Sequence, residues 1–89
     1  MSDNTINPEL WDFPCDMVFK AMADNKDGVE DAVIAAIQSV LPGDYVPQTR
    51  PSKNGTYISV SVRLYVENKE QVEAIYRVVR DVEHVKMCL

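Results

Sequence analysis

Apolar and polar residues alternate most regularly between Thr56 and Val66, a pattern that predicts a strand with one buried and one exposed face. The apolar positions are Ile58, Val60, Val62, Leu64 and Val66. Because this face is unbroken and rich in β-branched residues, we expect a central strand of a sheet. The alternate positions are Tyr57, Ser59, Ser61, Arg63 and Tyr65. These side chains should point away from the core.

Two further stretches alternate in the same way and predict strands at both ends of the chain. In residues 15–24 the inward set is Cys15, Met17, Phe19, Ala21 and Ala23, and the outward set is Asp16, Val18, Lys20 and Met22. In the C-terminal stretch HVKMCL we expect Val85, Met87 and Leu89 to point inward.

A short strand is also expected over residues 46–52, VPQTRPS. Pro47 and Pro51 have the same parity there, so both missing N–H groups lie on one side of the strand. A strand that lacks donors on one side belongs at the edge of a sheet. The Asn54-Gly55 pair that follows is typical of a tight hairpin turn.

Helical spacing of apolar residues appears twice. Residues 28–41 have it, with Asp27 and Glu30 at the spacing of a capping box and Pro42-Gly43 as a stop signal. In residues 68–82 the expected buried positions are Val72, Ile75, Tyr76, Val79 and Val82. Asn68 and Gln71 again have capping-box spacing.

The predicted order is βαββαβ, which is typical of the ferredoxin-like α+β sandwich. In this fold a four-stranded antiparallel sheet with spatial order 4-1-3-2 has both helices on one face. The strand with the two prolines then lies at an edge, as the prolines require. We expect residues 1–12 to be a flexible tail and residues 13–89 to form the domain.

Composition narrows the classes of function. A chain of 89 residues forms one domain, and its 46% hydrophobic and 26% charged content is that of an ordinary globular protein. Neither a signal peptide nor an apolar run long enough to span a membrane is present, so we expect a cytoplasmic protein with reduced cysteines. The net charge of -5 disfavours a nucleic-acid partner.

Several stretches of the sequence resemble those of one protein family. They are LPGDYVPQTRPSKNGTYISVSV, FPCDMVFKAMA, EQVEAIY and the terminal VKMCL. Over about residues 13–89 the chain is similar to the YbeD-like family of small uncharacterised bacterial proteins, whereas the first dozen residues depart from its pattern. The resemblance implies a ferredoxin-like fold similar to ACT regulatory domains, and a role in sensing a ligand or binding a partner without catalysis.

Candidate catalytic and metal-binding groups are few. His84 is the one histidine of the sequence. Four residues of strand hold it about 13 Å from Cys88 at ~3.3 Å per residue, and alternation places Cys15 and Cys88 on opposite faces, so we expect neither a metal site nor a disulfide. Asp12 and Asp16, like Glu67 and Glu70, occupy positions where carboxylates are commonly solvated or cap helices. With no nucleophile–base pair and no glycine-rich phosphate loop, we expect no catalytic residues and no cofactor.

The open side of the predicted sheet is the candidate binding surface. Alternation places Lys20, Arg63 and Lys86 there, with Tyr57, Ser59, Ser61 and Tyr65 beside them, and Arg50 joins if its strand keeps register. Exposed antiparallel faces need polar side chains in any case, so a merely solvated face is the simplest alternative. The sign of the charge favours a function, because three cations and no acid except Asp16 are expected on this face of an acidic protein.

We therefore expect a non-enzymatic regulatory or adaptor module that binds a small anionic metabolite or a protein partner. The alternative is binding of single-stranded RNA on the open side of the sheet, with Tyr57 and Tyr65 stacking on bases. No membrane partner is expected. The C-terminal strand is the edge that lacks prolines, so self-association by strand addition is easiest there, and Lys86 alone guards it. We expect a monomer or a weak homodimer.

Overall fold

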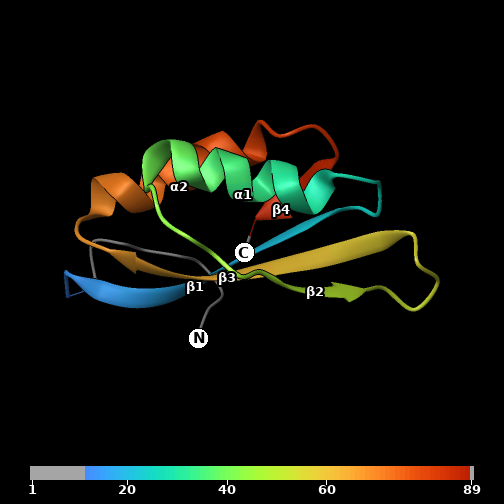
Figure 1. Ribbon diagram of the computed structural model, residues 1–89, viewed down its shortest axis with the longest axis horizontal. Helices are drawn as coiled ribbons and strands as arrows, with labels where there is room; N and C mark the ends of the chain where they lie inside the picture. Colours follow the sequence, from blue (N-terminus) through green and yellow to red (C-terminus); the bar gives the residue numbers. More distant parts are fainter. Residues whose placement is uncertain (1–11, 89) are drawn as a thin grey trace.

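The computed structural model describes residues 12–88, which form a four-stranded antiparallel sheet with two helices packed on one side (Figure 1). The elements are β1 (Cys15–Asp24), α1 (Val29–Val40), β2 (Gln48–Pro51), β3 (Tyr57–Val66), α2 (Lys69–Arg80) and β4 (Val85–Cys88). The sheet order β2-β3-β1-β4 is the predicted order read from the opposite edge. The predicted ferredoxin-like fold is confirmed.

The two central strands carry the core. β1 and β3 pair without interruption from Cys15 opposite Val66 to Asp24 opposite Tyr57. Alternate residues of both strands are fully buried under the helices, among them Phe19, Val60, Val62 and Leu64. On the helix side, Phe19 meets the ring of Tyr76 edge-on, with centroids 4.9 Å apart.

The two helices begin differently. At α2 the side chain of Asn68 accepts a hydrogen bond from the Gln71 amide at 2.9 Å, as the predicted capping box requires. The side chain of Gln71 returns to the amide of Glu67 at 2.7 Å, one residue before the position expected in a capping box. At α1 the predicted Asp27–Glu30 capping box is wrong. Gly28 is the N-cap, with a φ of 83° that favours glycine and with no side-chain cap.

β2 lies at an edge of the sheet, as its prolines predicted, and it is shorter than expected. Its register places Gln48 opposite Ser61 and Arg50 opposite Ser59. The turn that follows is held by Asn25, whose side-chain amide donates to the carbonyl of Gly55 at 3.1 Å. This contact connects the β2–β3 hairpin to the end of β1.

The pairing of the C-terminal strand differs from the regular alternation predicted for it. Its pairing with β1 shifts between Met22 and Ala23, so that Met87 lies opposite Met22 while Val85 lies opposite Ala23, and Lys86 is the extra residue of a bulge. A bulge reverses the side on which the following residues point. The expected inward position of Met87 is therefore wrong: Met87 is 49% exposed, and Cys88 packs against the core instead. Leu89 lies outside the described residues.

The register also separates the two cysteines. Cys15 lies opposite Val66, whereas Cys88 lies opposite Ala21, which is six residues further along β1 and about 20 Å away at ~3.3 Å per residue. Both are free thiols. Both cysteines point to the same side of the sheet, so the opposite orientation expected from the sequence is wrong. The distance along β1 keeps them apart.

Burial of Cys88 predicts how stability changes at alkaline pH. Burial raises the pKa of its thiol above the ordinary value of 9.0, against a smaller opposing effect of Arg80, and burial raises the pKa of Tyr76 and Tyr45 above 10.0. The folded protein thus keeps protons that the unfolded chain releases. The contribution of these three groups to the free energy of unfolding should be complete below the thiol range and should be lost as pH rises through the thiol range and then the phenol range.

Urea denaturation at a series of pH values measures this effect. A Cys88→Ala variant keeps both tyrosines, so its stability should begin to fall at a higher pH than that of the wild type. A wild-type midpoint that stays level or rises with pH would contradict the burial of these groups.

The burial of one face of β3 leads to a second prediction about stability. Val60 is fully buried at the centre of the sheet, so Val60→Asp places an unpaired charge in the core. The cost of several kcal/mol is comparable with the ~5–10 kcal/mol that stabilises a small domain, and the variant should be unfolded by circular dichroism. Ser61→Asp, one residue away on the other face, is the matched control and should melt cooperatively. A folded Val60→Asp variant would show that the faces of β3 are exchanged.

Candidate functional site

The side of the sheet turned away from the helices is not covered by any other part of residues 12–88 (Figure 1). We call it the open face. The side chains that alternate with the buried ones point to it from every strand. They are Asp16, Val18, Lys20, Met22 and Asp24 of β1, Gln48 and Arg50 of β2, Tyr57, Ser59, Ser61, Arg63 and Tyr65 of β3, and Met87 of β4.

The register arranges these side chains in rows across the strands. One row contains Gln48, Ser61 and Lys20. The next row contains Arg50, Ser59, Met22 and Met87. On the other side of the first row, Arg63 lies opposite Val18.

Lys20, Arg50 and Arg63 therefore occupy three successive rows, and we call them the open-face cations. All three side chains are exposed. Within residues 12–88 none of them forms an ion pair. Arg50 is on the open face, as expected for a strand that keeps its register.

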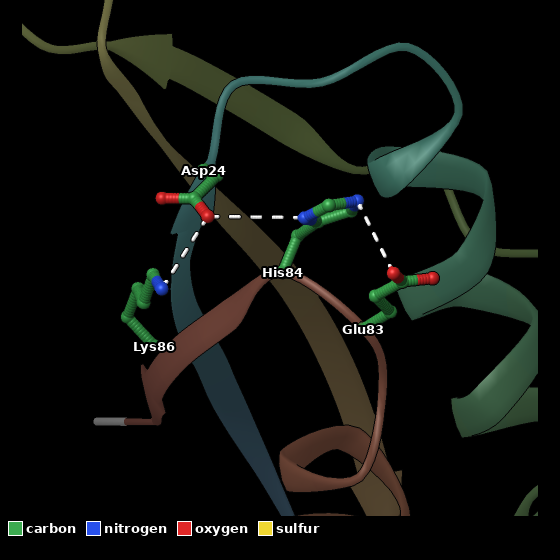
Figure 2. Close-up of polar contacts among 4 residues, drawn as sticks. All are labelled: Asp24, Glu83, His84 and Lys86. Atoms are coloured by element: carbon green, nitrogen blue, oxygen red, sulfur yellow. Dashed lines mark ion pairs between the residues drawn. The ribbon is translucent and has the colours of Figure 1, made fainter.

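Lys86 has a different environment, because it lies in the bulge of β4 and its ammonium is 3.4 Å from the carboxylate of Asp24 (Figure 2). The ring of His84 approaches the same carboxylate at 3.8 Å and that of Glu83 at 3.9 Å. The expectation that Asp16 would be the one acid among the cations is thus wrong, since Asp24 also points to the open face, opposite Tyr57. The charge of Lys86 is balanced locally, and the unpaired charge of the face belongs to Lys20, Arg50 and Arg63.

The two tyrosines named from the sequence both lie on the open face but far apart. Tyr57 and Tyr65 are at opposite ends of β3, a separation of about 26 Å at ~3.3 Å per residue. Each lies opposite an aspartate of β1, Asp24 and Asp16 respectively. Two rings at this distance cannot stack on consecutive bases.

Three adjoining hollows follow β3 across the open face. One of about 400 Å³ is lined by Val18, Val46, Gln48, Ser61, Val62 and Arg63. The next, of about 380 Å³, shares Gln48 and Ser61 with it and adds Lys20, Thr49, Arg50 and Ser59. The third, of about 160 Å³, shares Arg50 and Ser59 with the second and reaches Met22 and Tyr57. Neighbouring hollows share lining residues and so lie side by side along β3; we call the three together the β3 groove.

Apolar residues of the β3 groove were missed as site residues from the sequence. Alternation assigned Val18 and Met22 to the exposed side, but apolar side chains there were not considered as candidates. Val18 is 58% and Val46 is 88% exposed. Val46 lies in a loop, and its neighbour Tyr45 packs against the core and donates its hydroxyl to the carbonyl of Leu41 at 2.6 Å. Only a three-dimensional structure reveals that this loop reaches the groove.

The chemistry of the face is that of binding groups. Guanidinium and ammonium groups bind carboxylates or phosphates, and the exposed valine, methionine and tyrosine side chains offer apolar contacts. Among residues 12–88, no group of three His, Cys, Asp or Glu side chains is placed to hold a metal ion. Neither of the helices in this part of the chain is long and apolar enough to cross a membrane.

Comparison with known proteins agrees with the resemblance noted in the sequence. Residues 8–89 match the family described as "Protein of unknown function (DUF493)", so the match begins before residue 13. A UPF0250 protein of Shewanella piezotolerans is 43% identical over 81 residues, which cover 91% of this chain and 92% of the relative. A UPF0250 protein of Haemophilus influenzae is 41% identical over 81 residues, covering 91% and 88%.

Solved structures agree on the fold. Protein HP0495 from H. pylori superposes with a TM-score of 0.76 at 18% identity, covering 100% of this chain and 94% of the other. The ACT domain from the GTP pyrophosphokinase of Chlorobium tepidum superposes with a TM-score of 0.64 at 12% identity, covering 83% and 94%. The predicted likeness to ACT domains is confirmed at the level of the fold.

Proposed function

The chain belongs to the DUF493 family, and we propose that it is a non-enzymatic regulatory or adaptor module of the cytoplasm that binds an anionic ligand on its open face. The ligand is a small metabolite or a segment of a protein. The likeness to an ACT domain supports a module of this kind.

One observation carries the proposal. Lys20, Arg50 and Arg63 occupy successive rows of one face, are exposed, and have no acidic partner within residues 12–88, in a chain whose net charge is -5. Like charges on adjacent strands repel each other, more strongly at low salt. An anionic ligand relieves this repulsion, and the arginines are able to make bidentate contacts with a carboxylate or phosphate.

The non-enzymatic part of the proposal rests on the character of the side chains on the open face. Hydroxyl groups of Ser59 and Ser61 lie among cations, without a histidine or carboxylate beside them in their own rows to act as a base. The hydroxyl of Ser59 donates weakly to the carbonyl of Arg50 at 3.4 Å. Such groups hold and orient an anion.

We also propose that the protein is a monomer or a weak homodimer. Pro47 and Pro51 deprive the β2 edge of two donors, and the bulge at Lys86 interrupts the β4 edge. Both edges are thereby less suited to pairing with the strand of another molecule.

A triple variant, Lys20→Gln, Arg50→Gln and Arg63→Gln, tests the open face as the binding surface. We expect it to fold with stability equal to or slightly above that of the wild type, because charge repulsion is removed. It should lose both the proteins captured by the wild type from a bacterial lysate and any thermal stabilisation by citrate, phosphate or pyrophosphate. Quantitative mass spectrometry and thermal melts measure the two effects.

Lys26→Gln, Arg77→Gln and Arg80→Gln form the matched control, since these cations are exposed and lie outside the open face and the change in net charge is identical. This control and the single variant Lys86→Gln should bind like the wild type. If the folded open-face variant captures the same proteins and responds to the same anions as the wild type, the open face is merely solvated surface and the proposal is wrong. Binding of oligouridine with a steep salt dependence, lost in the open-face variant, would instead favour the single-stranded RNA alternative.

A further inference from the structure

We propose that the partner on the open face is an extended acidic segment of another protein, lying along the β3 groove with two acidic side chains between two apolar ones. This inference rests on the proposed function and specifies its ligand. It follows from the shape of the groove, the order of side chains along it, and the acid at one end.

The shape of the groove favours a long ligand. Its three hollows open side by side on the sheet surface, and the open-face cations are distributed along them. Arg50 lies opposite Ser59, and Ser59 is four residues from Arg63 on β3, about 13 Å at ~3.3 Å per residue. Sites for small molecules usually enclose the ligand and direct a few polar groups to one point. An extended chain meets distributed groups one after another.

The side chains along the groove alternate in character in a way that a peptide can match. Val18 and Val46 line one end beside Arg63. Lys20 and then Arg50 occupy the middle rows. Tyr57 lines the other end, and Met22 lies in the same row as Arg50. Apolar side chains thus line both ends of the groove, Lys20 and Arg50 lie between them, and Arg63 adds a third cation at the Val18 end.

The spacing of the rows sets the spacing of the partner's side chains. Outward residues of β3 recur every two positions, about 6.6 Å apart, and alternate side chains of an extended peptide recur at the same distance. A peptide parallel or antiparallel to β3 thus presents every second side chain to successive rows. The expected pattern is apolar, acidic, acidic, apolar at alternate positions.

The partner lies on the face of the sheet because the adjacent edge is unsuitable. Pro47 and Pro51 have no N–H groups, and both of the missing donors belong to the same side of the β2 chain. A peptide that paired with β2 as a fifth strand would lack these hydrogen bonds. Recognition therefore depends on side chains, including the adaptable Met22 and the neighbouring Met87.

An aspartate at one end of the open face distinguishes a short acidic segment from a nucleic acid. Asp16 lies beyond Val18 at this end, whereas Asp24 at the other end is paired with Lys86 and adds no unbalanced charge. A nucleic acid carries a phosphate at every nucleotide and would place negative charge near Asp16. A peptide whose acidic residues are confined to the middle meets only the cations.

Selection from a displayed library of random peptides of about ten residues, long enough to span the groove at ~3.3 Å per residue, tests the inference. The immobilised bait is the full chain. Peptides enriched on the wild type should contain two acidic residues at alternate positions with apolar residues two positions before and after them. Their affinity should fall at least about tenfold for Lys20→Gln with Arg50→Gln, as expected when contacts with charged groups are lost.

A charge-reversed bait makes the test specific. Lys20→Glu with Arg50→Glu should enrich basic residues at the two middle positions while the apolar positions are kept. Lys26→Glu with Arg77→Glu, outside the open face, should select the same peptides as the wild type. Absence of enriched peptides, enrichment without acidic residues, or the same peptides on the charge-reversed bait would each overturn the inference.

The same baits distinguish failure of the acidic-peptide inference from failure of the proposed function. If acidic peptides are not selected but pyrophosphate or oligouridine binds the wild type and not the variant lacking the open-face cations, the open face is a binding surface for another anion and only the inference is wrong. If none of these probes depends on the open-face cations, both proposals are wrong.

Discussion

The uninterrupted pairing of β1 with β3 is the interaction on which the rest of the structure depends. It places Phe19, Val60 and Val62 under the helices at the centre of the core. Because the side-chain period of a strand is two, the same pairing determines every residue that points the other way. A slip of one residue would turn the charged side chain of the slipped strand, Lys20 of β1 or Arg63 of β3, towards the core and its apolar side chains outward. The register that stabilises the fold thus also assembles the open face.

The composition of the open face is more specific than exposure requires. An exposed face of an antiparallel sheet needs polar side chains, and in an acidic chain these would more easily be neutral or negative. Among the described residues, this face instead has three cations without an acidic partner in adjacent rows, while the fourth candidate, Lys86, is neutralised by Asp24. Holding the cations together costs stability that a solvated surface does not recover. An anionic partner gives this arrangement a physical reason.

Most of the fold was predictable because its signals are local. Alternation identified the long strands, helical spacing identified both helices, and Pro47 and Pro51 placed β2 at an edge. The errors arose where long-range pairing overrides local pattern. The bulge at Lys86 turns Met87 outward, and its position depends on how β4 meets β1. At α1, glycine in a left-handed conformation replaced the expected side-chain cap.

The candidate site was predictable only in part, for similar reasons. Lys20 and Arg63 follow from alternation alone, whereas Arg50 requires the register of β2 against β3. The contribution of Asp24 depends on its contact with Lys86, which arises from the bulge. The β3 groove is a property of shape, since Val46 reaches it from a loop without periodic pattern.

Amide chemical shifts of the ¹⁵N-labelled full chain, recorded during titration with an acidic peptide of the proposed pattern, report which surface binds the ligand. We expect shift changes to concentrate on β1, β2 and β3 around Lys20, Gln48, Arg50 and Ser61, and to weaken as salt is added. Changes concentrated on the exposed surfaces of α1 and α2, with the strands unaffected, would contradict this expectation.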